Sequence, residues 1–176
     1  MSYEFIYDSE IEGLRTPDKF YAYAIAYLNS SILLVKNITE NEKEHSWENC
    51  SVVLHLSSHA VELFLNYALL SHSINTKVHG HDIEWLHEKY KKVYASADYE
   101  FLMPFQSEHF SKTRAEEIQS KQDVLEQLST RSVRYRYTTN SVYEKWNVIE
   151  AFEPNWFLQT MVQMKSDFAR IRSKIT

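Results

Sequence analysis

The sequence contains very little glycine, proline or cysteine. Its 176 residues include two glycines, three prolines and one cysteine. All-β folds and glycine-rich phosphate-binding loops need more turn residues than this, so the composition favours long helices. The single Cys50 excludes an internal disulfide bond and a multi-cysteine zinc site. We therefore predict an all-α protein that forms one domain over residues 1–176.

Membrane-directed segments are also lacking. There is no run of 18 uninterrupted apolar residues, and residues 1–12 carry four acidic side chains and no basic one. A transmembrane helix requires such a run, and a signal peptide begins with basic residues followed by an apolar stretch. We expect a soluble, cytoplasmic protein that does not contact a membrane.

Charge is distributed unevenly along the chain, whose net charge is −5. Residues 1–110 hold 8 basic and 16 acidic side chains, whereas residues 111–176 hold 11 and 8. An acidic protein repels phosphates at long range, which disfavours non-specific binding to duplex nucleic acid. A local anion site in the last third of the chain remains compatible with this distribution.

The clearest helix start lies at residues 16–18. Thr16 is a favourable N-cap, Pro17 suits the first helical position and Asp18 suits the first turn. The predicted helix runs to about residue 37 and is followed by a polar loop. A second helix of about seven turns is predicted from Trp47 to Ile74.

Apolar spacing predicts the remaining elements. Asp82 caps or starts one helix, a charged helix runs from Thr113 to about Leu128, and the last helix begins near Pro154. Residues 130–143 are rich in β-branched and aromatic side chains and leave the helical pattern. The last helix has a heptad-like apolar face formed by Phe157, Met161, Met164, Phe168 and Ile171. We predict an up-and-down bundle of four to five helices with an irregular insertion before the last helix.

The second predicted helix carries a polar stripe on an otherwise apolar surface. At 100° per residue its members fall within about 80° of one another; they are Ser51, His55, His59, Glu62, Asn66 and Ser73. Such a helix is expected at the centre of a bundle. Its stripe faces either solvent or a ligand or partner, and the pattern alone leaves both interpretations open.

A second candidate site lies before the last helix. Three arginines, Arg131, Arg134 and Arg136, alternate with Tyr135 and Tyr137. Guanidinium groups bind phosphate through two parallel hydrogen bonds, and tyrosine rings stack on bases. This segment therefore predicts an anion-binding site, although the arginines could instead pair with acidic residues of the same chain.

Other chemistries find little support. Imidazole and carboxylate groups lie close together at His79, His81 and Asp82, but the pattern His55-x3-His59-x2-Glu62 lacks the glutamate that follows the first histidine of a metalloprotease helix. The glycines Gly13 and Gly80 form no P-loop or dinucleotide-binding fingerprint. We predict neither a metal nor a cofactor.

The stretch Ser57–Leu70, followed by Val78–Leu86, resembles the HEPN domains (higher eukaryote and prokaryote nucleotide-binding superfamily). These domains have a second helix of the pattern polar-Ala-x-Glu-x-x-Leu-Lys-Ala-Leu-Leu and then a His-Asp-Leu type helix start. By this resemblance Glu62 matches the recurrent acid of that helix, and Asn66 stands where lysine is usual. The resemblance implies a helical domain that forms homodimers and binds nucleotides or RNA.

Ribonucleases of this family carry an Arg-x(4–6)-His motif near their last helices. No histidine follows His109 in this sequence, so neither Arg131 nor Arg134 can be the arginine of that motif. The expected function is therefore a non-catalytic HEPN-like module that binds a nucleotide, RNA or another anionic partner. The alternative is a metal-independent endoribonuclease of the toxin–antitoxin or phage-defence type, with His59 and Glu62 as acid and base. A partner protein such as a nucleotidyltransferase, facing the acidic first helix, is a further possibility under the resemblance.

Overall fold

The computed structural model describes residues 9–77, 81–103 and 152–175. Within these ranges the chain forms helices and no strand, so the predicted all-α bundle is confirmed. The elements are α1 (Ser9–Glu12), α2 (Thr16–Glu40), the 3₁₀ turn η1 (Glu42–Glu44), α3 (Trp47–Ser71), α4 (Ile83–Val93), η2 (Ala97–Tyr99) and α7 (Pro154–Ile175). The helix predicted over residues 113–128 and the irregular insertion lie outside the described residues.

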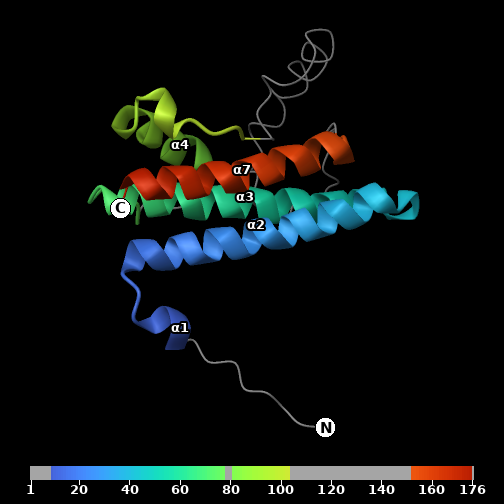
Figure 1. The fold of residues 1–176 in the computed structure, drawn as a ribbon, viewed down its shortest axis with the longest axis horizontal. Helices are drawn as coiled ribbons and strands as arrows, with labels where there is room; N and C mark the ends of the chain where they lie inside the picture. The colour runs from blue at the N-terminus through green and yellow to red at the C-terminus, as the bar shows by residue number, and fades with distance from the viewer. Residues whose placement is uncertain (1–8, 78–80, 104–151, 176) are drawn as a thin grey trace, which may run out of the picture.

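Three long helices, α2, α3 and α7, lie side by side with their axes nearly aligned (Figure 1). α2 runs in the opposite direction to α3, and the Ser31 hydroxyl donates to the Val53 carbonyl at 3.2 Å between them. α7 runs parallel to α3, and the two helices meet through the rings of Phe64 and Phe168. Because α2 is antiparallel to α7, Arg172 near the end of α7 lies 4.2 Å from the Tyr21 ring near the start of α2.

α4 covers the end of α3. The Tyr94 hydroxyl donates to the Ala68 carbonyl of α3 at 2.9 Å, and burial raises the pKa of Tyr94 to about 12. This hydroxyl therefore keeps its proton at neutral pH and remains a donor. From the other side, the Arg170 guanidinium of α7 donates to the Glu100 carbonyl at 2.7 Å and to the Asp98 carbonyl. The segment after α4 is thus attached to α3 and to α7.

The core is built around α3, which α2, α4 and α7 all contact. Its fully buried apolar side chains include Val53, Val61, Phe64, Leu65 and Leu69. Among the described helices, α3 alone is long and apolar enough to cross a membrane, yet most of its apolar window is buried inside the bundle. Central position in the core accounts for that composition.

The apolar face predicted for the last helix is confirmed. All five of its members are at most 2% exposed in α7: Phe157, Met161, Met164, Phe168 and Ile171. Their spacing of three and four residues places them along one side of the helix, where they meet α2 and α3. Periodicity alone therefore located this contact surface correctly.

Three of the four predicted helix starts that lie in the described residues need no correction, among them that of α3 at Trp47, and one does. The Asp82 side chain accepts from the Trp85 N–H at 2.9 Å and caps α4, and α7 begins at Pro154 as predicted. At α2, however, the N-cap residue is Arg15 and Thr16 is already helical. The Arg15 side chain makes no capping bond; its Nε donates instead to Asp18 Oδ2 at 2.7 Å.

α3 ends three residues earlier than predicted, at Ser71 rather than Ile74. Ser73 adopts a positive φ of 60°, which turns the chain away from the helix axis. The Ile74 N–H donates to the Leu69 carbonyl and the Ser73 N–H to the Leu70 carbonyl, both at 3.0 Å. This pair of bonds is the Schellman motif, which normally places glycine at the position of positive φ. Because serine occupies this position, the sequence does not show where the helix ends.

Replacing Ser73 by glycine is expected to stabilise the protein. A left-handed backbone conformation costs a residue with a Cβ about 1–2 kcal/mol, and glycine avoids this cost. Part of the resulting stabilisation is offset by the greater freedom of glycine in the unfolded chain. The Ser73→Gly variant should therefore raise the free energy of unfolding by about 0.5–1 kcal/mol in urea titrations. Ser73→Ala keeps the Cβ and should bring no such gain; equal stabilisation by both variants would contradict this explanation.

Candidate functional site

The polar stripe of α3 is not an open surface groove. Glu62 and Asn66 are each only 3% exposed, while His55 and His59 are partly buried. Ser73 does not belong to the stripe, because α3 has ended before it. The other residues of the stripe are therefore held largely within the protein. We call the group His55, His59, Glu62 and Asn66, together with His81, the α3 seam.

Glu62 is the centre of the α3 seam. Its Oε1 lies 2.9 Å from Nδ1 of His81, the residue just before the cap of α4. A carboxylate oxygen can only accept, so the imidazole donates from Nδ1 and its tautomer is set by this bond. Nδ1 of His59 lies 3.6 Å from the same oxygen, which is within ion-pair range but longer than a hydrogen bond. Two imidazoles thus share one buried carboxyl group.

Neighbouring rings fix the imidazole of His59. The Tyr27 ring of α2 meets it edge-on with centroids 4.5 Å apart, and the His55 ring lies parallel to it at 6.2 Å. Asn66 completes the seam, since its Nδ2 donates to the Glu62 carbonyl at 2.9 Å. The seam therefore combines a rigid, partly buried imidazole with a carboxyl group whose orientation is determined by its partners.

His81 is the exposed member of this arrangement. Its side chain is 89% exposed although Nδ1 is bonded to a buried carboxyl group. With Nδ1 engaged, Nε2 is the nitrogen available to a ligand, as an acceptor when the ring is neutral and as a donor when it is protonated. Within the described ranges, no three His, Cys, Asp or Glu side chains are arranged to hold a metal ion.

The sequence-predicted residues divide into two groups. The structure brings His55, His59, Glu62 and Asn66 together, and it adds His81, which the sequence had suggested as a possible metal ligand and as part of the HEPN-like segment but not as a partner of Glu62. The five residues of the basic segment lie outside the described residues: Arg131, Arg134, Tyr135, Arg136 and Tyr137. Helical periodicity could not have predicted the contact between His81 and Glu62, because the two residues belong to different elements.

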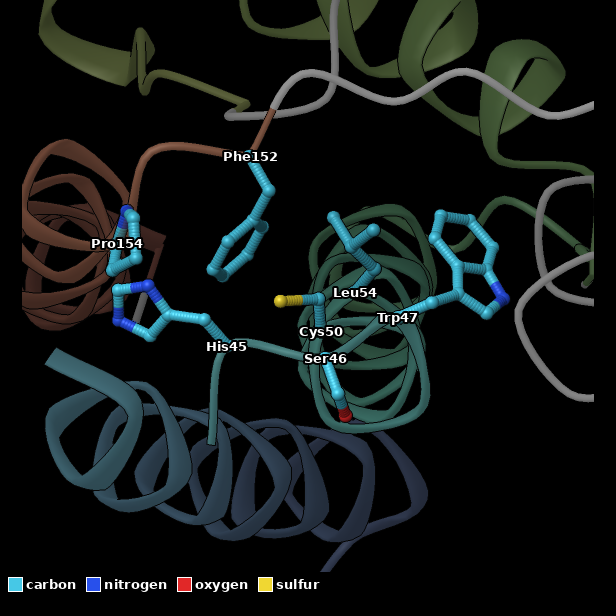
Figure 2. Close-up of a pocket in the computed structure, with 7 residues that line it drawn as sticks. All are labelled: His45, Ser46, Trp47, Cys50, Leu54, Phe152 and Pro154. Carbon is cyan, nitrogen blue, oxygen red and sulfur yellow. The ribbon is translucent and has the colours of Figure 1, made fainter. Parts of the chain in front are cut away.

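A pocket that the sequence did not predict lies at the other end of α3 (Figure 2). It has a volume of about 300 Å³ and is formed by the turn before α3, the first two turns of that helix and the segment entering α7. The rings of His45 and Phe152 contribute to its lining, Pro154 and Leu54 add apolar surface, and Trp47 also lines it, with its ring directed away from Phe152. Figure 2 shows the Cys50 thiol directed toward the rings of Phe152 and His45.

The chemistry of this pocket differs from that of the seam. None of the described residues lining it is Lys, Arg, Asp or Glu. Burial raises the pKa of the Cys50 thiol, so the sulfur stays protonated at neutral pH and is a poor nucleophile. The His45 ring is fixed by contact between its Nε2 and the Ile38 carbonyl at 2.9 Å. The pocket is therefore a mainly apolar recess, to which His45 and Ser46 add polar groups.

Comparisons with known proteins identify no relative. No family model matches the chain, and neither a curated protein nor a solved structure does.

Proposed function

We propose that this chain is a non-catalytic HEPN-like module that forms a homodimer and binds a nucleotide or single-stranded RNA. In this proposal the binding surface is formed by His81, the exposed member of the α3 seam, and by the basic segment Arg131–Tyr137. The observation that carries it is the hydrogen bond from His81 to the buried carboxyl group of Glu62. It orients an exposed imidazole, a group able to contact ribose hydroxyls and phosphate oxygens.

The burial of polar groups along α3 supports a binding role. An unpaired polar side chain in a core costs about 1–3 kcal/mol, and Glu62 and Asn66 avoid that cost through the hydrogen bond from His81 and the bond from Asn66 to the Glu62 carbonyl. Glu62 and Asn66 occupy positions where leucine would pack without any such requirement. A binding surface that needs a fixed imidazole accounts for this arrangement.

Exposed apolar side chains beside the seam support dimer formation. Tyr23 and Leu34 of α2 are 49% and 38% exposed, and their spacing of eleven residues places them on one face of the helix. Tyr27 lies on the same face and contacts His59 of the seam. This face carries Tyr and Leu without charged groups, so two copies can meet there without like-charge repulsion. Dimerisation would then bring two seams close together.

The test is RNA binding measured together with oligomeric state. We expect sedimentation of a dimer and binding of labelled single-stranded RNA that weakens with salt. The double variant Arg134→Ala/Arg136→Ala should weaken binding at least about tenfold at low salt, since each phosphate contact to a single strand contributes a salt slope of about −0.7. His81→Ala should weaken binding without reducing the salt slope to the same extent.

The matched control removes two positive charges elsewhere. Lys91 and Lys92 are exposed at the end of α4, so Lys91→Ala/Lys92→Ala lowers the net charge equally without touching the seam. Equal weakening by both double variants would mean that RNA binding reflects only general electrostatic attraction. A strict monomer that binds no RNA would refute the proposal.

A metal-independent endoribonuclease is the second candidate function. It is favoured by the 3.6 Å approach of His59 Nδ1 to Glu62 Oε1, an imidazole–carboxyl pair suited to proton transfer. Cleavage of the same RNA in the presence of EDTA, lost in His59→Ala, would establish this function. Cleavage that persists in His59→Ala would remove these residues from any catalytic role.

A further inference from the structure

We propose that the pocket at the start of α3 binds a small, uncharged aromatic molecule. This site is separate from the seam. Cys50 and His59 are nine residues apart on the same helix, which places them about 180° apart around its axis and about 13 Å apart along it. The pocket faces Phe152 and Pro154, whereas His59 faces Tyr27 of α2. A ligand in the pocket would therefore not touch the seam.

The size and shape of the pocket set the size of the ligand. Its volume of about 300 Å³ lies at the lower end of small-molecule sites, which suits a one- or two-ring compound. The walls come from different parts of the chain, since Leu54 belongs to α3 and Phe152 precedes α7 (Figure 2). Leu54 is only 4% exposed and packs in the core, so it forms a fixed floor for the recess.

The lining sets the chemistry of the ligand. The Phe152 and His45 rings offer flat faces for stacking or edge-on contact, and the protonated Cys50 thiol directed toward them is a soft, apolar surface. A carboxylate or phosphate would lose its hydration here and meet no Lys or Arg among the described lining residues, and the His45 Nε2 is already engaged by the Ile38 carbonyl. The recess therefore selects neutral rings over anions, the reverse of what is proposed for the seam.

The experiment uses the full chain and a matched pair of probes, 5-fluoroindole and 5-fluoroindole-2-carboxylate, observed by ¹⁹F NMR. We expect the neutral probe to bind with a Kd of about 0.1–1 mM, as befits its few atoms, and the anion to bind at least about tenfold more weakly. Because Cys50 is the only cysteine of the chain, its alkylation by iodoacetamide reports on occupancy directly. Saturating 5-fluoroindole should slow this alkylation about threefold or more.

Variants locate the binding. Cys50→Leu fills the recess and Phe152→Ala removes one wall, so each should weaken 5-fluoroindole binding at least about tenfold. Cys50→Ser keeps the volume and should change the Kd by less than about threefold. Leu33→Ala, at a 70% exposed site of α2 that does not line the pocket, should leave the Kd unchanged. Circular dichroism confirms that each variant is folded.

Three results would overturn the proposal: no binding of 5-fluoroindole at millimolar concentration, equal binding of the two probes, or an unchanged Kd in Cys50→Leu. If Cys50→Leu or Phe152→Ala fails to fold, protection of Cys50 in the wild-type protein decides the question alone. These outcomes do not depend on RNA binding, so this proposal and the proposed function can fail separately.

Discussion

Phe64→Ala is expected to lower the free energy of unfolding by about 3–5 kcal/mol, the largest effect of any single substitution considered for this protein. Phe64 and Phe168 are fully buried, and their rings stack with centroids 3.7 Å apart and planes 4° apart. Phe101 meets the Phe64 ring edge-on at 5.5 Å. Truncation would remove the contact joining α3 to α7 and leave a cavity among large rings that cannot collapse freely.

Urea unfolding followed by circular dichroism measures this effect. Phe64→Leu retains most of the volume and should cost less than half as much. Leu33→Ala, at a side chain 70% exposed on α2, is the control and should change the stability by less than about 0.5 kcal/mol. A loss below about 1 kcal/mol in Phe64→Ala would show that the stacked rings do not join these helices in solution.

Glu62→Ala is expected to cost about 2–3 kcal/mol, through the loss of polar partners rather than of apolar contact. The variant leaves the buried Nδ1 of His59 without its neighbouring carboxyl group and removes the acceptor of His81. Because His81 directly precedes the cap of α4, the start of that helix should loosen as well. Hydrogen exchange should then speed up at the first amides of α4 more than in α2 or α7.

Two further variants separate these causes. Glu62→Gln keeps the volume and one acceptor oxygen, so its loss should be about half that of the alanine variant. Glu88→Ala removes an exposed carboxyl group from α4 and should lie within about 0.5 kcal/mol of wild type. If Glu62→Ala and Glu88→Ala were equally mild, the buried carboxyl group would not anchor α4.

Much of the helical framework could be predicted because it depends on local patterns. The apolar spacing from Phe157 to Ile171 and the cap at Asp82 are both encoded within a few adjacent residues. The end of α3 could not be predicted, since Ser73 takes a backbone conformation that its side chain does not signal. Local chemistry thus determines where most helices begin and which face they bury.

The α3 seam and the pocket depend on contacts between residues far apart in the sequence, which local patterns cannot predict. His81 reaches Glu62 across 19 residues of sequence, and only the packing of α4 on α3 brings them together. The pocket is more remote still, because Cys50 and Phe152 are about 100 residues apart. Sequence inspection found the polar side of α3 but treated it as a surface, since burial of Glu62 becomes evident only once α2 and α4 are in place.

The position of α7 has a consequence for how the protein folds. α7 joins α2 through Arg172, whose guanidinium lies over Tyr21 and 3.6 Å from the Asp18 carboxylate, and it joins α3 through Phe168. These contacts link residues about 100 or more positions apart, so closing them carries a loop entropy cost that α2 and α3 alone do not incur. On the ribosome, α2 and α3 can pair early, but the large rings of their shared core stay uncovered until the last helix has emerged. The emergence and docking of α7, rather than helix formation, would then limit the rate at which this helical bundle forms.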